Sequence, residues 1–381
     1  MTRFKRPACL VAYWEGEELR VRDCATGKTS PVLPAEVALL TALTRWRSLA
    51  EIAHDFAEAG RRELRAAVRG LLSRGLVISS DRPQVEAERQ LSAWRDWSPE
   101  ATLFHFGTKD LEYMDWREEG AEMERVMAWS PPPSPLKQVR GRQIELPAYP
   151  RRGMLPSVLL SRRSWRRFGR QTVTLDQVST LLGLTWGVQK WAHVGRGIRF
   201  ALKTSPSGGG CHSIEVYLAV RQVRGLHPGL YHYCPDSHAL TLLNKPWTFG
   251  RMTRALGGQP WFAHASATAF MTSVFPRVQW KYRAPRTYRV VLLEAGHFCQ
   301  TFCLVATWLG LAPFCTAALA DTLIERDLGI DGVNESVLYA AGVGPRPGAV
   351  SWAPWWDRKD VPRTTLPLHR MRRTGARRSA T

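Results

Sequence analysis

Residues 279–300 read QWKYRAPRTYRVVLLEAGHFCQ, and the apolar run that begins inside this stretch decides the fold of the larger part of the chain. The run continues over residues 290–320 with few polar interruptions. It is long enough to suggest a membrane span, but Glu294, His297 and the helix-breaking Pro313 favour a buried helix followed by a strand. Because Glu294 and His297 stand three residues apart on one helix face, we expect them to form a buried, hydrogen-bonded pair.

A cluster of cations and aromatic side chains precedes this predicted helix. Lys281 and Tyr282 come first, and Arg286, Tyr288 and Arg289 follow within a few residues. Such side chains are common on surfaces, so an exposed turn is one interpretation. A cluster that leads directly into a buried helix also favours a functional role, in which the charges are paired or act on a bound group.

Composition limits the class of protein. The chain has 381 residues and a formal net charge of +20, which suits two domains, or one large domain with an appendage, and an anionic partner such as phosphate, nucleic acid or an acidic peptide. The seven cysteines have no CxxC spacing, and no close Cys/His cluster predicts a metal site. Cys299 and Cys303, one helical turn apart, are typical of core packing. The odd cysteine count and the lack of a signal-peptide pattern predict a reducing, cytoplasmic location.

Residues 1–82 have a pattern of their own. Two short β-prone runs around EGEE predict a hairpin, three amphipathic helical patterns follow, and a strand closes the unit after Gly75. Ser48 and Glu51 form a capping-box pattern at the second helix. This order resembles the winged-helix-like, PqqD-like domains that bind peptides. DNA binding is disfavoured, because the third helix offers few side chains that read bases, and a purely structural role stays open.

Residues 83–150 form a helical and proline-rich connector whose SPPPSP segment predicts extended backbone. Residues 151–350 alternate helical and strand patterns, which predicts an α+β domain, with Thr174 as a helix cap. Residues 351–381 form a basic C-terminal tail. Its stretch from residue 358, RKDVPRTTLPLHRMRRTGARRSAT, contains prolines and few large apolar side chains, so we expect poor order after about residue 365.

Two further motifs could hold an anionic cofactor. In SRRSWRRF, the side chains of Arg162, Ser164 and Arg166 stand at alternate positions and could converge on a phosphate. In KTSPSGGGCHSIEVY, the glycines let the backbone approach a flat group closely, and a strand follows at once. The second motif is neither a dinucleotide fingerprint nor a Walker loop. Each motif alone also fits a solvated face or a flexible loop.

Taken together and in order, RRSWRRF, PSGGGCHSIEVY, GLYHY, KYRAPRTYR with EAGHFCQ, the Gly310-Leu311 turn and GVGPRP resemble the SagB-type peptide dehydrogenases of the nitroreductase superfamily, over roughly residues 97 to 347. Two positions depart from the family pattern: Ser213 stands where proline is expected and Cys211 where arginine is usual. The resemblance implies a nitroreductase-like FMN-binding domain that follows a small winged-helix-like domain.

The resemblance also implies roles for individual residues. It assigns proton transfer to Lys281 and Tyr282, with either one as the base, beside a flavin that accepts hydride. Burial and the nearby Arg286 and Arg289 would bring their pKa values toward the working pH. It places FMN against Arg162, Arg163, Ser164, Arg166, Pro206, Ser207, Gly208, Gly209, Arg286, Gly310 and Arg346.

The implied reaction is the oxidation of azolines to azoles in a ribosomally synthesised precursor peptide. The enzyme would be a homodimer with FMN at the subunit interface, and a cyclodehydratase would supply the azolines. Another flavin-dependent step, such as reduction of dehydroamino acids or oxidation of a side chain, is one alternative. A non-enzymatic peptide-binding scaffold is the other. The sequence identifies neither the peptide nor the residue modified, and it predicts no membrane partner.

Overall fold

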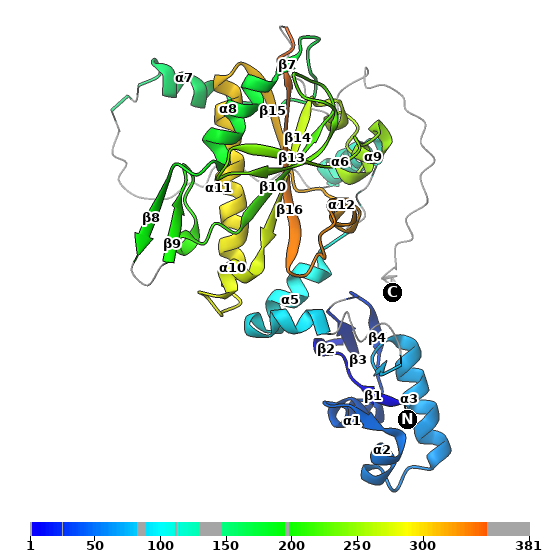
Figure 1. Ribbon diagram of the computed structural model, residues 1–381. Helices are drawn as coiled ribbons and strands as arrows, with labels where there is room; N and C mark the ends of the chain where they lie inside the picture. The colour runs from blue at the N-terminus through cyan, green and yellow to red at the C-terminus, as the bar shows by residue number, and fades with distance from the viewer. Residues whose placement is uncertain are drawn as a thin grey trace.

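The computed structural model describes residues 2–348 apart from 25, 82–88, 111–112, 114, 130–146, 149 and 195–197. Figure 1 shows a small N-terminal domain joined by a helical connector to a larger α+β domain. The predicted extended SPPPSP segment and the predicted basic tail lie outside the described residues.

The N-terminal domain has the predicted hairpin, three helices and a closing strand. The sheets are β2-β3-β4 and β5-β1-β6. The elements are β1 (Arg3–Lys5), β2 (Leu10–Glu15), β3 (Glu18–Asp23), β4 (Thr29–Pro31), α1 (Pro34–Ala42), β5 (Arg47–Ser48), α2 (Leu49–Asp55), α3 (Arg61–Arg74) and β6 (Ile78–Ser79). The capping box is confirmed, because the Ser48 hydroxyl accepts from the Glu51 N–H and Glu51 accepts from the Ser48 N–H. Gly75 ends α3 in the left-handed region, with φ 79°.

Cys9 and Cys24 form a disulfide in this domain, with their Cα atoms 5.5 Å apart. The sequence analysis did not predict this pair. Disulfides are typical of oxidising compartments. This disulfide therefore does not support the predicted cytoplasmic location, which stays a prediction.

The connector packs against the larger domain through aromatic side chains. Its described elements are the 3₁₀ helix η1 (Ser92–Trp97), α5 (Ser98–Gly107) and α6 (Trp116–Trp129). Trp94 and Trp97 are almost fully buried, and each lies edge-on to Phe275 of the larger domain. The connector is therefore part of the folded core of the larger domain. Burial of these large rings contributes strongly to its stability.

A six-stranded antiparallel sheet, in the order β13-β12-β10-β14-β16-β15, forms the centre of the larger domain. The α+β domain predicted over residues 151–350 is confirmed. The strands are β10 (Ile214–Val220), β12 (Gly229–Cys234), β13 (Ala239–Asn244), β14 (Ala267–Val274), β15 (Leu311–Thr316) and β16 (Glu335–Pro345). The sequence analysis missed the hairpin of β8 (Lys190–Val194) and β9 (Ile198–Leu202), and the short parallel pair of β7 (Val173–Thr174) and β11 (Val223–Arg224).

Helices cover both faces of this sheet (Figure 1). One core cluster packs α8 (Leu175–Trp186) and α11 (Thr287–Trp308) on alternate residues of β10 and β14. The other packs α9 (Phe249–Ala255) and α12 (Asp321–Leu328), which the sequence analysis missed, on the opposite residues. Thr174 caps α8 as predicted, accepting from the Gln177 N–H at 3.2 Å. Two short helices, α7 (Met154–Ser161) and α10 (Phe275–Gln279), complete the domain.

Helix α11 is the buried helix that the apolar run predicts. It is long and apolar enough to cross a membrane, yet half of its most apolar window is buried inside the fold. It is followed at once by β15, and both elements lie in contact with β16. Its contacts are those of a core helix, which agrees with the interpretation from its polar side chains.

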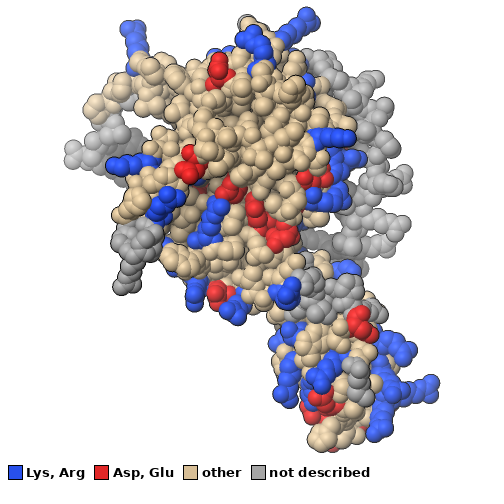
Figure 2. Space-filling view, viewed as in Figure 1, with Lys and Arg blue, Asp and Glu red and all other residues tan. Residues whose placement is uncertain are grey.

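Charge is distributed widely over the surface. On the face shown in Figure 2, Lys and Arg side chains are spread over both domains, with acidic side chains among them, rather than gathered into one stripe. This face does not have the continuous basic track that nucleic-acid binding favours.

Candidate functional site

The glycine loop, residues 206–211, leads into β10 and lies against the first half of α11. An added Cβ at Gly208 would collide with the Val290 side chain. An added Cβ at Gly209, where φ is 65°, would lie 2.5 Å from the Tyr282 hydroxyl oxygen. Gly208 is therefore required because there is no space for a side chain. Gly209 is required for the same reason and because its backbone is in the left-handed region.

Lys281 and Tyr282 lie on this loop. The Lys281 ammonium donates to the Gly209 carbonyl oxygen at 3.0 Å. The Trp97 indole donates to the Tyr282 carbonyl oxygen at 3.1 Å, which ties the turn to the connector. Both side chains are exposed in the single chain, Tyr282 to 38%. The burial expected for this pair is therefore not found in one chain. The pair nevertheless lies beside the glycine loop, a contact that the sequence had not predicted.

Glu294 and His297 do not pair with each other, so that prediction is wrong. Glu294 is buried and accepts hydrogen bonds from the hydroxyls of Ser207, at 3.0 Å, and Ser213, at 3.2 Å. His297 is exposed, and its Nδ1 lies 3.1 Å from the Pro206 carbonyl oxygen. The helix therefore presents two polar groups to the loop rather than to each other. Burial raises the pKa of Glu294, and the two serine hydrogen bonds partly offset this effect.

This contact explains one departure from the family pattern. Proline has no hydroxyl to offer Glu294, whereas Ser213 places one in the core at the start of β10. No local sequence pattern indicates this contact, because the two residues are 81 positions apart. Another unpredicted group is Lys203, which follows β9 with its ammonium 5.7 Å from the centre of the Phe298 ring. Burial lowers its pKa.

The arginine segment, residues 162–169, lies at the other end of α11. Its backbone runs beside the start of β15 and the end of β16, with the Trp165 N–H donating to the Pro313 carbonyl oxygen at 2.9 Å and the Gly169 N–H to that of Pro345 at 2.8 Å. The Arg346 guanidinium lies 5.5 Å from the centre of the Trp165 ring. Gly310, with φ 71°, forms the turn that enters β15.

Several predicted cofactor residues thus come together here. The segment that carries Arg162, Ser164 and Arg166 lies beside the strand ends that carry Gly310 and Arg346. Neither Arg162 nor Arg346 forms an ion pair with an acidic residue among the described residues, as expected of cations that bind an external anion. Arg163 turns back instead, since its guanidinium donates to the carbonyl oxygens of Leu160 at 3.0 Å and Arg162 at 2.7 Å.

Arg286 lies apart from the arginine segment, at the first turn of α11. With Arg289 it lines a pocket of about 390 Å³ between α11 and the connector helix α5. The remaining lining is mainly apolar and aromatic: Ala101, Phe104, Pro285, Tyr288 and Leu292, with Glu100 at the edge. This pocket is close in sequence to Lys281 and Tyr282 and could accept a substrate side chain.

The predicted site is divided within one chain. The glycine loop, Lys281 and Tyr282 lie at the beginning of α11, and the arginine segment lies beside β15, which follows its end. From Val290 to Trp308 the helix axis rises about 27 Å at 1.5 Å per residue. The structure therefore brings together two halves of the predicted residue set, but not the whole set.

Comparisons with known proteins agree with this fold. Residues 159–345 match the nitroreductase family. A Methanocaldococcus jannaschii protein described as a nitroreductase is 31% identical over 176 residues, which cover 46% of this chain and 84% of the relative. The trifolitoxin-processing protein TfxB of Rhizobium leguminosarum is 22% identical over 316 residues, 77% of this chain and 83% of the relative.

A third relative, the microcin B17-processing protein McbC of Escherichia coli, is 31% identical over 136 residues, 33% of this chain and 48% of the relative. Together with the α+β fold and the two half-sites, the match to the archaeal protein shows the class of this chain. It belongs to the nitroreductase family.

Proposed function

We propose that this protein is an FMN-dependent oxidoreductase that modifies a ribosomally synthesised peptide, and that it converts azolines into azoles. The observation that carries the proposal is the seating of Lys281 and Tyr282 on the glycine loop, where both side chains lie next to Gly209. The similarity to proteins named for processing trifolitoxin and microcin B17 supports a peptide as the substrate.

The residues present fit FMN. The loop around Gly208 and Gly209 leaves no room for a side chain, which suits a backbone surface against a flat ring. Arg162 and Arg346 would hold the phosphate, with a hydroxyl from Ser164. Bound FMN would accept a hydride from the azoline carbon.

The remaining task of the site is to remove a proton from the neighbouring carbon of the azoline. Lys281 in its neutral form, or Tyr282 as its phenolate, would accept this proton, because both side chains lie next to Gly209. The Lys281 ammonium also stabilises negative charge that develops beside the loop. Glu294 acts indirectly, because it fixes Ser207 and with it the path of the glycine loop.

A homodimer would complete the site. The two halves lie at opposite ends of α11 in one chain, so a second copy could bring its glycine loop to the arginine segment. The apolar surface needed for such an interface is present. Helix α7 has no buried residue, although most of its side chains are apolar, and Leu293 and Trp308 of α11 are 61% and 49% exposed. Exposed apolar side chains in such numbers are typical of protein interfaces.

The N-terminal domain would dock the precursor peptide. Strand β2 is an edge strand of its sheet and exposes Tyr13 and Trp14, to 38% and 69%. An edge with exposed aromatics suits the addition of a peptide strand. Deleting residues 1–80 should weaken activity on a full precursor and spare activity on a short core peptide. Equal losses on both peptides would indicate a structural role instead.

The decisive experiment combines spectroscopy with product analysis. Purified protein should be yellow, with one flavin per chain identified as FMN after denaturation. Under anaerobic conditions, a peptide that contains a thiazoline or oxazoline should bleach the flavin and lose two hydrogen atoms by mass spectrometry. Flavin-free protein that still binds the peptide would favour a scaffold. Bleaching by some other peptide, with azolines unchanged, would favour a different redox step.

A further inference from the structure

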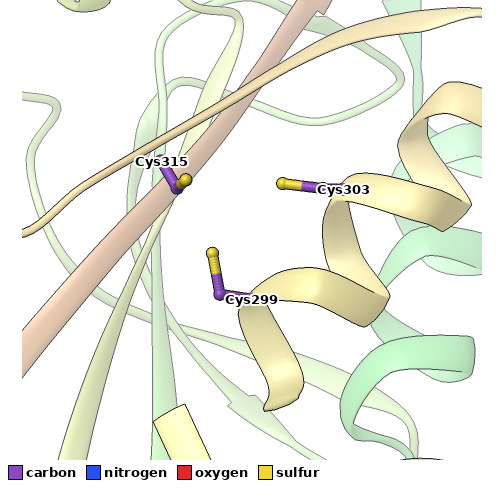
Figure 3. Close-up of side chains that lie close together, drawn as sticks. All are labelled: Cys299, Cys303 and Cys315. Atoms are coloured by element: carbon purple, nitrogen blue, oxygen red, sulfur yellow. The ribbon is translucent and has the colours of Figure 1, made fainter. Parts of the chain in front are cut away.

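Three cysteine sulfurs converge in the core near the end of α11. Cys299 and Cys303 belong to α11 and Cys315 belongs to β15, and all three Sγ atoms lie within 4.8 Å of one another. Figure 3 shows the three side chains pointing toward one common point between helix and strand. Cys299 and Cys303 are each only 3% exposed, and Cys315 is partly buried.

The chain geometry explains why these residues meet. Cys299 and Cys303 are four residues apart, so both face the sheet. After the turn at Gly310, β15 lies in contact with α11. Cys299 lies about 14 Å along the axis from the end of the helix, and Cys315 about 13 Å from the start of the strand. The two positions are therefore level with each other.

We propose that Cys299, Cys303 and Cys315 form a buried binding site for a thiophilic cation of the Zn²⁺ or Cu⁺ class. Thiolates are the preferred ligands of both ions. Sulfurs at about 2.3 Å from a tetrahedral Zn²⁺ are about 3.8 Å apart. The observed spacing is close enough that small side-chain movements reach this geometry.

Neighbouring groups would complete the ligand set and its charge balance. Tyr339, on β16, packs with Cys315 against the core cluster that contains Cys299 and Cys303. Its oxygen would supply the fourth ligand that Zn²⁺ requires, whereas the three sulfurs alone suffice for Cu⁺. Three thiolates and a divalent ion carry one excess negative charge. The arginine segment, which carries Arg162 and runs beside β15, would supply positive charge nearby.

The position of the site indicates what a bound ion would do. β15 is the edge strand of the sheet, and the arginine segment is hydrogen-bonded to it through Trp165. An ion bound by both α11 and β15 would fix this edge strand to the helix and stabilise the folded domain. A buried thiol is also a satisfactory small apolar side chain, but packing alone does not require three sulfurs from two elements to face one point. The inference does not depend on flavin binding.

The test uses the full-length protein, anaerobic and with a non-thiol reductant. Zn²⁺ and Cu⁺ are titrated separately against a competing chelator, and Cd²⁺ is added as a probe whose bonds to thiolate absorb in the ultraviolet. We expect one ion per chain and a higher Tm with metal. The Cys315→Ser variant should bind at least about 100-fold more weakly and show no rise in Tm. Tighter binding of Zn²⁺ or of Cu⁺ identifies the ion.

The matched control also loses one free thiol. Cys234→Ser should bind like the unchanged protein, because Cys234, on β12, is not in the cluster. If Cys315→Ser does not fold, as judged by circular dichroism, Cys303→Ser provides the same comparison. The proposal is overturned if the reduced protein binds less than one ion, or if all variants bind equally. A disulfide between two of the three cysteines in the native protein, detected by mass spectrometry after alkylation, would also overturn it.

Discussion

The two ends of α11 carry the two halves of the candidate site, and they are built in opposite ways. At the beginning of the helix, polar groups are bonded within the chain: one carboxylate oxygen of Glu294 accepts from two serines, and Lys281 donates to a carbonyl oxygen. At the end of the helix, Arg162 and Arg346 have no acidic partner among the described residues. The half-site at the beginning of α11 is held in place by bonds within the chain. The half-site at its end has positive charge that an external anion would balance.

The largest expected effect tests the arginine end. In the double variant Arg162→Ala with Ser164→Ala, loss of two phosphate contacts should cost about 3–6 kcal/mol, or roughly two to four decades of FMN affinity. Flavin content after purification and a fluorescence titration with FMN would measure it. Arg163→Ala removes an equal charge whose guanidinium is bound to backbone carbonyls, so it should keep its flavin. A double variant that purifies with full flavin would remove the phosphate assignment.

The second effect tests the loop end. Lys281→Ala and Tyr282→Phe should each keep FMN but slow flavin reduction by about 10² to 10⁴, the usual contribution of a positioned proton-transfer group. Anaerobic stopped-flow absorbance would measure the rate at several pH values. The variant that loses one limb of the pH profile identifies the base. The neighbouring, exposed Arg283→Ala serves as control, and unchanged rates in both test variants would leave the pair as a surface turn.

The third effect concerns the contact between the connector and the start of α11. His105 is buried, its Nδ1 lies 2.7 Å from the Tyr288 hydroxyl, and burial lowers its pKa to about 3. Below pH 6.5 the unfolded chain binds a proton that the folded chain does not, so stability falls as the pH falls toward 3. Between pH 6.5 and 5 the loss should be about 2 kcal/mol.

Urea denaturation at pH 7 and pH 5 would measure this loss. His105→Gln should lower stability at pH 7 but show a smaller further loss at pH 5. The exposed His54→Gln should behave like the unchanged protein. An equal pH dependence in His105→Gln and the unchanged protein would show that another group is responsible.

The smallest effect concerns Glu294, whose pKa is raised chiefly by burial. Between the ordinary carboxyl pKa and the raised one, the folded chain binds more protons than the unfolded chain, so stability falls as the pH rises. Glu294→Gln should lose this fall and still accept hydrogen bonds from Ser207 and Ser213. Urea denaturation above pH 4.5 would measure it, with the exposed Asp176→Asn as control. A fall that persists unchanged in the glutamine variant would contradict the assignment.

Much of the fold could be predicted because it is encoded locally. Apolar periodicity identified the strands of the central sheet and the buried helix, and the capping patterns at Ser48 and Thr174 were confirmed. The hairpin of β8 and β9 was missed although Gly195-Arg196-Gly197, a turn signal, separates its two short runs. The candidate site residues were identified from the order of several motifs along the chain. This order does not show that the motifs lie at opposite ends of α11.

The sequence by itself determined the elements, their caps, the excess of positive charge and the motifs that resemble a flavin site. Only the tertiary structure decided which side chains meet. Glu294 bonds to serines more than 80 positions away rather than to His297, and Cys315 joins two cysteines of another element. The physical reason is range: helix and strand periodicity depend on neighbours within a few residues. Contacts between elements instead depend on strand order, register and burial, which are properties of the whole folded chain.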